Sequence, residues 1–483
     1  MKKLSTLICL GVAFAASATA PKLEIYSGEK DTVFSPEHYV IAVTDPGCNA
    51  TINSEEIHVY KTGSFGTMLP LKPGKNNISV KVTDAKKKKA EKKFTVFYST
   101  DKPQAKVVPP VETQKLLKPL DITTLPGAYL QNGNGDDRLG GSKMGFVVED
   151  IPMTAVGETE GLYKVQLSDN RYAYLPKEYA KEGGEGRATV NSGSWSIMNI
   201  GQKDRVTVAL PRRVPYYYTT EIDPSTIKVY LFGVTNNSNW ITQRNQPGMI
   251  DYVDFAQDDS DVLTLIIRLK EKYQWGFSVS YQGNNIVIDV NHRPESLALK
   301  DLVIGVDAGH GEQYLGAVSP SGLTEKEVNL DIVKKIAAML EAEGAKVVLS
   351  RPDDSNVSMT QRKQIFREAG VDLMVSVHNN ASGNPLAPMG TSVYYKHIAN
   401  RPLAKALHSS MLKLGVADFG LTGNFNFSLN GPTEYPNALV EGLFMSSLPE
   451  EEMLADPDFR TKMAQQVVDG IKNYLKEVEN SLK

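Results

Sequence analysis

Four polar residues stand where a chain of alternating strands and helices would place its chemistry. His310 follows the apolar run "LVIGV" in "VDAGHG", His378 ends "DLMVSVH", and Glu441 lies inside "ALVEGLF". Glu325 comes just after "SPSGLT", at the expected start of a long helix. Because ligands and catalytic groups collect at the carboxyl ends of parallel strands, we expect these two imidazoles and two carboxylates to lie at one edge of a sheet.

Two histidines and two carboxylates meet the requirements of a catalytic zinc site. Such a zinc ion is typically held by three protein ligands drawn from His and carboxylate, and the fourth position is left for a water whose pKa falls to about 7. A carboxylate outside the ligand set can then move protons. The residue types leave open which Glu would be the ligand and which the proton carrier.

Each of the four residues also has a purely structural interpretation. A histidine at a strand end is often only a hydrogen-bonded residue, and Glu325 alone would favour the positive end of a helix dipole. Glu441 is harder to explain in this way, because an unpaired carboxylate buried in an apolar strand is strongly unfavourable. On spacing alone, a metal site and a structural role both stay open.

The elements that must position these residues lie in the segment 300–483. Apolar runs of strand length, such as "LVIGV", "KVVLS" and "TSVYY", alternate there with segments of helical period. In the expected helix after Thr324, apolar residues recur every four positions, at Val328, Ile332, Ile336 and Leu340. The alternation predicts a C-terminal α/β domain in which helices flank a mostly parallel sheet.

Five motifs in this segment occur in an order that resembles a known family. The motifs are "VDAGHG", "GLTEKEVNLDIVKKI", "VVLSRPDD", "VDLMVSVHNNAS" and "PNALVEGLF". Over residues 302–478 the chain resembles the zinc-dependent N-acetylmuramoyl-L-alanine amidases, the large family that contains bacterial cell-division and sporulation amidases. The resemblance implies a Zn²⁺ hydrolase that cleaves the amide between N-acetylmuramic acid and L-alanine of peptidoglycan. It further implies that the metal ligands are His310, Glu325 and His378, and that the catalytic residue is Glu441.

The chain departs from the family pattern at two places. Glu312 stands where the family usually has a second Gly after its first His-Gly pair, and the family's Glu-Leu-Gly-Phe run appears here as Glu441-Gly442-Leu443-Phe444. Neither change removes a ligand, so we expect a reshaped cleft around an intact site. The segment 379–440 is short, and a strand, a helix near 400–414 and a loop occupy most of it. We therefore expect none of the long inhibitory helical insertions that some family members carry there.

Residues beside the expected site are candidates for substrate contact. Asn379 and Asn380 follow His378 directly. The stretch "SLNGPTEYP" (428–436) is predicted to be a loop over the cleft, in which Asn430 and Glu434 could contact substrate; a plain surface loop is the alternative.

The first 300 residues read as all-β modules. Short alternating strands and Pro/Gly turns in 21–100 resemble the bacterial Ig-like sandwiches found ahead of catalytic domains. The Pro- and Lys-rich segment 101–120 is predicted to be a linker. Residues 121–182 resemble a bacterial SH3-like barrel, a module that often holds an enzyme on the cell wall, and 190–295 is a third β domain that faintly resembles those preceding cell-wall amidase domains.

Aromatic residues in these modules could stack on a ligand, or they could belong to hydrophobic cores. The candidates are Tyr163, Tyr172 and Tyr174 in the SH3-like segment, and Trp195, Trp240, Trp275 and Tyr216–Tyr218 in the third β domain. Burial is the commoner outcome for such residues.

Composition and the N-terminus indicate where the protein acts. With 53 basic and 56 acidic side chains, the net charge of -3 gives no electrostatic reason to expect a nucleic acid or a membrane surface as partner. Residues 1–20 have the order of a secretory signal peptide, with cleavage after Ala18 or Ala20, and no other apolar run would span a membrane. We therefore expect an exported protein of the periplasm or cell envelope whose partner is peptidoglycan. The oligomeric state is left open.

Two other functions are compatible with the same sequence. A zinc peptidase that cuts within the peptidoglycan stem peptides would use the same ligand set, because the metal could polarise any amide. A non-catalytic adaptor that binds the cell wall would use the β modules and keep the α/β domain silent.

Overall fold

The computed structural model describes residues 20–29, 32–103, 111–137 and 139–483. Residues 1–19 of the predicted signal peptide and 104–110 of the predicted linker thus lie outside the described residues. The chain divides into two compact units, 1–103 and 104–483. A search of the described helices for one with the length and apolar character of a membrane span finds none.

The first unit is a sandwich of two sheets. One sheet contains β1 (Leu23–Ser27), β3 (Glu37–Thr44) and β6 (Ser64–Pro70). The other contains, in order, β2 (Thr32–Val33), β8 (Lys89–Tyr98), β7 (Gly74–Thr83), β4 (Asn49–Ile52) and β5 (Glu55–Ile57). Inward-facing residues of both sheets, among them Val40, Phe65 and Val80, make the core. Cys48 is buried and forms no disulfide with any described residue.

The second unit begins with a seven-stranded antiparallel sheet. Its order is β11 (Gly140–Phe146), β10 (Tyr129–Asp137), β14 (Tyr172–Pro176), β13 (Leu162–Gln166), β12 (Pro152–Thr159), β9 (Gln114–Thr124) and β15 (Ala180–Glu182). Strand β9 starts inside the segment 101–120, so the predicted linker was too long. Pro119 does not prevent pairing because the β9–β12 register jumps between Leu120 and Lys115, which leaves the proline in a bulge.

The next part has two facing sheets. The first contains β22 (Ile241–Arg244), β17 (Trp195–Asn199), β18 (Lys203–Val208), β26 (Asn285–Asn291) and β25 (Phe277–Gln282). The second contains β19 (Tyr216–Ile222), β20 (Ser225–Phe232), β24 (Val262–Leu269) and β23 (Ile250–Asp259), and β16 (Val190–Asn191) pairs separately with β21 (Val234–Thr235).

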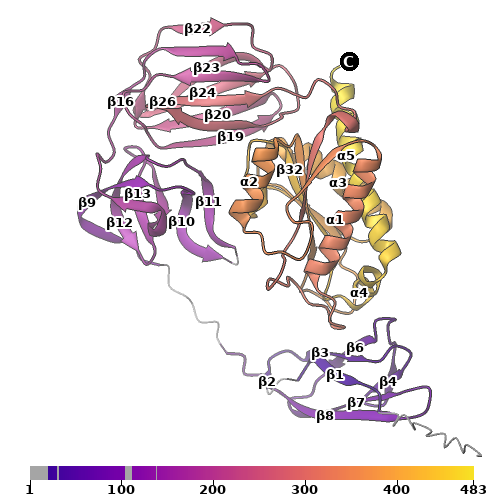
Figure 1. Ribbon diagram of the computed structural model, residues 1–483. Helices are drawn as coiled ribbons and strands as arrows, with labels where there is room; N and C mark the ends of the chain where they lie inside the picture. The colour runs from indigo at the N-terminus through magenta and orange to yellow at the C-terminus, as the bar shows by residue number, and fades with distance from the viewer. Residues whose placement is uncertain (1–19, 30–31, 104–110, 138) are drawn as a thin grey trace, which may run out of the picture. The chain divides into compact units, whose positions relative to one another are not determined.

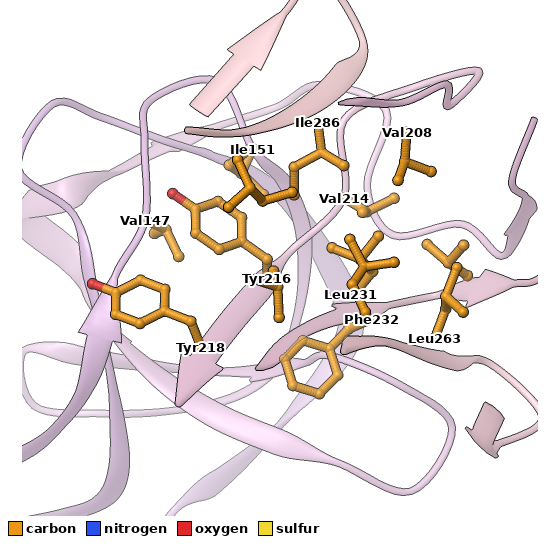
Figure 2. Close-up of a cluster of buried hydrophobic side chains, with 14 of the residues drawn as sticks. Val147, Ile151, Val208, Val214, Tyr216, Tyr218, Leu231, Phe232, Leu263 and Ile286 are labelled. Carbon is orange, nitrogen blue, oxygen red and sulfur yellow. The ribbon is translucent and has the colours of Figure 1, made fainter. Parts of the chain in front are cut away.

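One hydrophobic core runs through both of these β parts. Figure 2 shows Val147 and Ile151, from the segment between β11 and β12, beside Tyr216 and Ile286 of the following sheets. The hydroxyl of Tyr216 also accepts a hydrogen bond from the Val148 N–H at 3.2 Å. The two β parts therefore pack as one body.

Most of the candidate stacking aromatics belong to cores. Trp195, Trp275, Tyr216 and Tyr218 are buried, as is Tyr163. Trp240 is the exception among the tryptophans, with 67% of its surface exposed, and Tyr172 is also exposed.

From Val303 onward the chain forms a sheet with helices on both faces (Figure 1). Its order is β28 (Lys346–Leu349), β27 (Val303–Ala308), β29 (Leu373–Asn380), β32 (Asn437–Phe444), β30 (Thr391–Tyr394) and β31 (Asp418–Thr422). All neighbouring pairs are parallel except β30 with β32. The helices are α1 (Glu325–Ala342), α2 (Met359–Ala369), α3 (Arg401–Met411), α4 (Leu448–Ala455) and α5 (Pro457–Ser481).

Alternate residues of β29 decide which helix covers which face. Leu373 and Val375 lie in the core that α1, α3 and α5 contribute to, whereas Met374 lies in the core with Phe366 of α2. The predicted apolar stripe on α1 is confirmed, because Val328, Ile332, Ile336 and Leu340 are all buried.

We expect Ile332→Ala to lower the free energy of unfolding of this domain by about 2–5 kcal/mol, because a fully buried side chain leaves a cavity when truncated. Differential scanning calorimetry of the full chain measures the effect. Lys334→Ala on the exposed face of the same helix is the control, with an expected change within about 0.5 kcal/mol. Equal effects of the two substitutions would contradict the assignment of the buried face.

Candidate metal centre

Three strands deliver their site residues to one edge of the sheet. His310 follows the end of β27, His378 lies near the end of β29, and Glu441 lies in β32 directly beside His378 in the parallel register. Because the three strands are parallel neighbours, their carboxyl ends meet at the same edge, as the sequence predicts.

Ligand atoms of His310, Glu325 and His378 all lie within 4.8 Å of one another. The Nε2 of His310 is 3.1 Å from one oxygen of Glu325, and the Nδ1 of His378 is 3.0 Å from the other. The two imidazole rings have centroids 5.0 Å apart. The three residues predicted as ligands therefore lie together. His310 comes from the end of β27, His378 from the end of β29 and Glu325 from the start of α1.

Left-handed backbone and two glycines make this convergence possible. His310 has φ 64°, Gly311 φ 144° and Glu312 φ 48°, so the chain turns sharply at the first histidine. A Cβ on Gly309 would lie 2.3 Å from the ring of His378, and one on Gly316 would lie 2.4 Å from a Glu325 oxygen. Any side chain at either glycine would occupy the space that the ligand groups need.

Glu325 is held by the backbone as well as by the histidines. Its Oε2 accepts a hydrogen bond from the Ala317 N–H at 2.8 Å, and its Oε1 accepts one from the Asn379 N–H at 3.1 Å. Thr324 precedes the helix, but its hydroxyl donates to Glu327 and does not cap the backbone. The carboxylate is thus fixed toward the sheet edge by partners on both sides.

The electrostatics favour charge on this buried cluster. Burial works to raise the pKa of Glu325, but the hydrogen bonds and charges of the two histidines hold that pKa far below its usual range. Burial likewise works to lower the pKa of His378, but Glu325 outweighs it and raises the pKa to about 9. A metal bound here would replace the proton that the cluster otherwise holds.

Glu441 lies beside the three-residue cluster and outside it. The residue is 8% exposed, and its charge adds to the field that raises the pKa of His378. Its backbone carbonyl accepts a hydrogen bond from the Thr391 hydroxyl at 3.1 Å. The β29–β32 register and this effect on His378 place Glu441 next to the cluster.

Two buried arginines hold the turn that carries His310. Arg362 forms an ion pair with Asp307 at 2.7 Å and donates to the carbonyl of His310 at 2.6 Å. Arg351 donates to the carbonyls of Ala308 at 3.0 Å and Gly309 at 2.9 Å. Charged donors therefore satisfy three successive carbonyls of the turn, those of Ala308, Gly309 and His310.

Sequence reasoning missed both arginines and Asp307, although Arg351 and Asp307 lie in motifs that it quoted. All three side chains are at most 2% exposed. The available signal was an Asp at the end of an apolar strand, since such a carboxylate needs a cationic partner, but the sequence does not show which arginine supplies it.

The structure does not turn Asn379 toward substrate. Its side chain donates to Asn329 Oδ1 at 2.9 Å and accepts from the Leu443 N–H at 3.0 Å, inside the domain. Asn380 is half-buried, and its Oδ1 accepts from the Ala381 N–H at 2.8 Å. Of the two, only Asn380 keeps part of its surface open at the sheet edge.

The prediction that 428–436 forms a loop over the cleft was wrong. This segment precedes β32, whose first residue Asn437 pairs with Met374 at the start of β29. The segment therefore lies at the amino ends of these strands, whereas His378 lies at their carboxyl ends. Asn430 is buried there and donates to the Tyr394 carbonyl at 3.2 Å.

The side chain of Glu434 forms an ion pair with Arg367 at 2.6 Å, and its carbonyl accepts from Asn291 of β26 at 2.7 Å. The following strand β32 runs parallel to β29, so the segment before it lies at the amino ends of both strands.

The departures from the family pattern lie around the site without entering the ligand set. The Glu312 N–H donates to the Asp354 carbonyl at 3.0 Å, and its own carbonyl accepts from Lys326 at 2.9 Å. Gly442 has no room for a larger residue, because a Cβ there would lie 2.4 Å from Met463 and 2.6 Å from Asn379. Within the described part of 379–440 the one α-helix is α3, which packs against α5 and the sheet.

The comparisons with known proteins concern this same segment. Residues 304–473 match the family model described as N-acetylmuramoyl-L-alanine amidase, and that range holds all four predicted site residues. N-acetylmuramoyl-L-alanine amidase LytC of Bacillus subtilis is 35% identical over 185 residues, which are 36% of this chain and 37% of that protein. The probable cell wall amidase LytH of Staphylococcus aureus is 31% identical over 192 residues, 39% of this chain and 64% of that protein.

Among solved structures, the catalytic domain of CwlV, an N-acetylmuramoyl-L-alanine amidase from Bacillus (Paenibacillus) polymyxa, is 33% identical. It has a TM-score of 0.35 and covers 36% of this chain and 98% of that chain. The chain spans less than two thirds of the length of either LytC or LytH.

We expect Gly309→Ala to weaken Zn²⁺ binding by roughly 10- to 100-fold, because the added methyl group displaces the ring of His378. Titration with a fluorescent zinc chelator measures the affinity. Gly133→Ala, where nothing lies within 4 Å of the added atom, is the control. An unchanged affinity in Gly309→Ala would contradict the proposed ligand geometry.

We expect Arg362→Met to destabilise the domain by about 3–5 kcal/mol, because it leaves Asp307 buried without its cation. Burial works to raise the pKa of Asp307. The charge of Arg362 and the hydrogen bonds that Asp307 accepts outweigh burial and hold this pKa below the ordinary 3.8. The pair's stabilisation is therefore present above about pH 4 and is lost as the pH falls further. Thermal unfolding of the wild type and of Arg362→Met, from pH 7 to pH 3, measures the difference in their free energies of unfolding. A difference that does not shrink toward pH 3 would contradict the stabilising role of the ion pair.

Proposed function

We propose that residues 300–483 form a zinc-dependent hydrolase that cleaves the amide between N-acetylmuramic acid and L-alanine in peptidoglycan. One observation carries the proposal: two imidazoles and a carboxylate converge within 4.8 Å beside a second, buried carboxylate. The match of 304–473 to the amidase family model supports the substrate class.

The residues at the site fit zinc. Two nitrogen donors and one carboxylate are a ligand set of catalytic zinc sites, which keep a further position open. Gly309 and Gly316 leave a space that side chains would fill. We propose His310, Glu325 and His378 as the ligands. When bound, zinc would polarise the amide carbonyl and lower the pKa of a water.

The chain's own groups would move the proton. Glu441 is placed to accept a proton from the attacking water and to return it to the leaving amine nitrogen of L-alanine. Its burial keeps bulk water away from the carboxylate, and its neighbour His378 fixes its distance to the ligand cluster through the β29–β32 register. Asn380, at the rim, is the one predicted substrate contact whose position is compatible with that role.

The β modules would bring this domain to its polymeric substrate. We propose the sandwich of 21–100 as Ig-like and the sheet of β9 to β15 as SH3-like, with the third β domain packed on the latter through a common core. We further propose that residues 1–20 direct export and that the protein works in the periplasm or cell envelope. Its partner there would be peptidoglycan.

We expect Glu441→Gln to keep the bound zinc and to lower kcat for peptidoglycan hydrolysis by roughly 10²- to 10⁴-fold, because the amide cannot carry a proton between water and amine. Elemental analysis and release of soluble peptides from purified peptidoglycan are the two readouts. Identifying the newly formed amino groups distinguishes the two possible reactions. Free amino groups on L-alanine support the amidase, whereas cuts between amino acids would show that the enzyme is a peptidase. Wild-type protein with neither zinc nor release would contradict the enzyme proposal.

A further inference from the structure

Two carboxylates at the start of α4 are buried outside the candidate metal centre. Glu450 is 1% exposed and Glu451 is 0% exposed. Carboxylates survive such burial only where donors satisfy them. Their donors include backbone N–H groups of segments next to the site residues.

Glu450 joins the loop after β29 to the end of β32. Its Oε1 accepts from the N–H groups of Met389 at 2.9 Å and Gly390 at 2.6 Å, and its Oε2 accepts from the Phe444 N–H at 2.9 Å. Phe444 ends the strand that carries Glu441. The side chain of Glu450 thus fixes the loop after β29 relative to the end of β32.

The loop 381–390 is bound along its length to the same segment. Four further hydrogen bonds connect the two: Ser382 N–H to the Ser446 hydroxyl at 2.9 Å, Ser446 hydroxyl to the Ser382 carbonyl at 3.1 Å, Ser447 hydroxyl to the Ala387 carbonyl at 2.9 Å, and Leu448 N–H to the Pro385 carbonyl at 2.8 Å. Directly before the loop, the Met445 N–H donates to the carbonyl of Asn380 at 2.8 Å. Because the loop leaves β29 just after His378, it forms a wall beside the metal position.

Glu451 reaches the remaining wall. Its Oε1 accepts from the Ser321 N–H at 2.7 Å, in the connection between His310 and Glu325. The start of α4 therefore contacts the three segments that leave or approach the site: the one before α1, the one after β29 and the end of β32.

We propose that Glu450 is a positioning residue that fixes loop 381–390 as the substrate-binding wall of the cleft. The proposal rests on the proposed amidase function. The donors to Glu450 among the described residues lie in the loop and at the end of β32, and none belongs to His310, Glu325 or His378. The residue therefore sets where the peptide part of the substrate lies and leaves metal binding unchanged.

The test is Glu450→Gln in the full chain. The substitution keeps the size of the side chain but turns an NH₂ group toward backbone N–H donors that need an acceptor. With a soluble muropeptide that contains the N-acetylmuramoyl-L-alanine amide, we expect KM to rise about tenfold, kcat to stay within about threefold, and zinc content to be unchanged. Glu452→Gln on the same helix is the control, with KM unchanged. Loss of zinc, or a fall in kcat at constant KM, would overturn the proposal.

Hydrogen exchange separates this proposal from the proposed function. Glutamine keeps one acceptor oxygen, so the substitution removes the acceptor either of Met389 and Gly390 or of Phe444. We expect the amides on the side that loses its acceptor to exchange at least tenfold faster in Glu450→Gln than in the wild type, and this readout does not need activity. Unchanged exchange at all three amides overturns the positioning role even if the enzyme is an amidase. Faster exchange in Glu450→Gln, together with a wild type that hydrolyses no muropeptide, would instead refute the amidase function and, with it, the substrate wall.

Discussion

The site depends on the buried ion pair between Asp307 and Arg362. The carboxylate ends strand β27, and the guanidinium that neutralises it also donates to the carbonyls of the turn that follows. These hydrogen bonds fix the backbone on both sides of the residue that carries the first imidazole, His310. Arg351 completes the arrangement on Ala308 and Gly309, so two cations hold a backbone conformation that His310, with φ 64°, would otherwise adopt rarely.

The carboxyl and amino ends of the parallel strands contact different parts of the protein. The carboxyl edge carries the candidate ligands, Glu441 and the loop tied down by Glu450. The opposite edge, where β32 begins, is bound by the third β domain: the Phe277 N–H donates to the Thr433 carbonyl at 2.8 Å, and Gly276 leaves no room for a Cβ beside Glu434. The same β domain also packs Tyr273 and Trp275 against Tyr474 of α5. It thus contacts the α/β domain at the end of the sheet opposite to Glu441 and on helix α5.

Sequence patterns predict those parts of the structure that depend on local order. The four-residue repeat on α1 indicates its buried face, and strand ends rich in Gly and His indicate where chemistry lies, because both signals need only neighbouring residues. Asn430 and Glu434 were misplaced, because the segment before a parallel strand lies at its amino end and Glu441 lies toward its carboxyl end. The partner of Asp307 and the backbone donors of Glu450 come from segments distant in the chain, so local order does not predict them.

We propose His310, Glu325 and His378 as zinc ligands, with Glu441 outside the ligand set. Anomalous diffraction at the zinc absorption edge, from crystals of the full chain grown with zinc, distinguishes these roles. We expect one strong anomalous peak bonded to those three side chains, with Glu441 adjacent but outside bonding distance. A peak bonded to Glu441 in place of Glu325, or no peak between the two histidines, would contradict it.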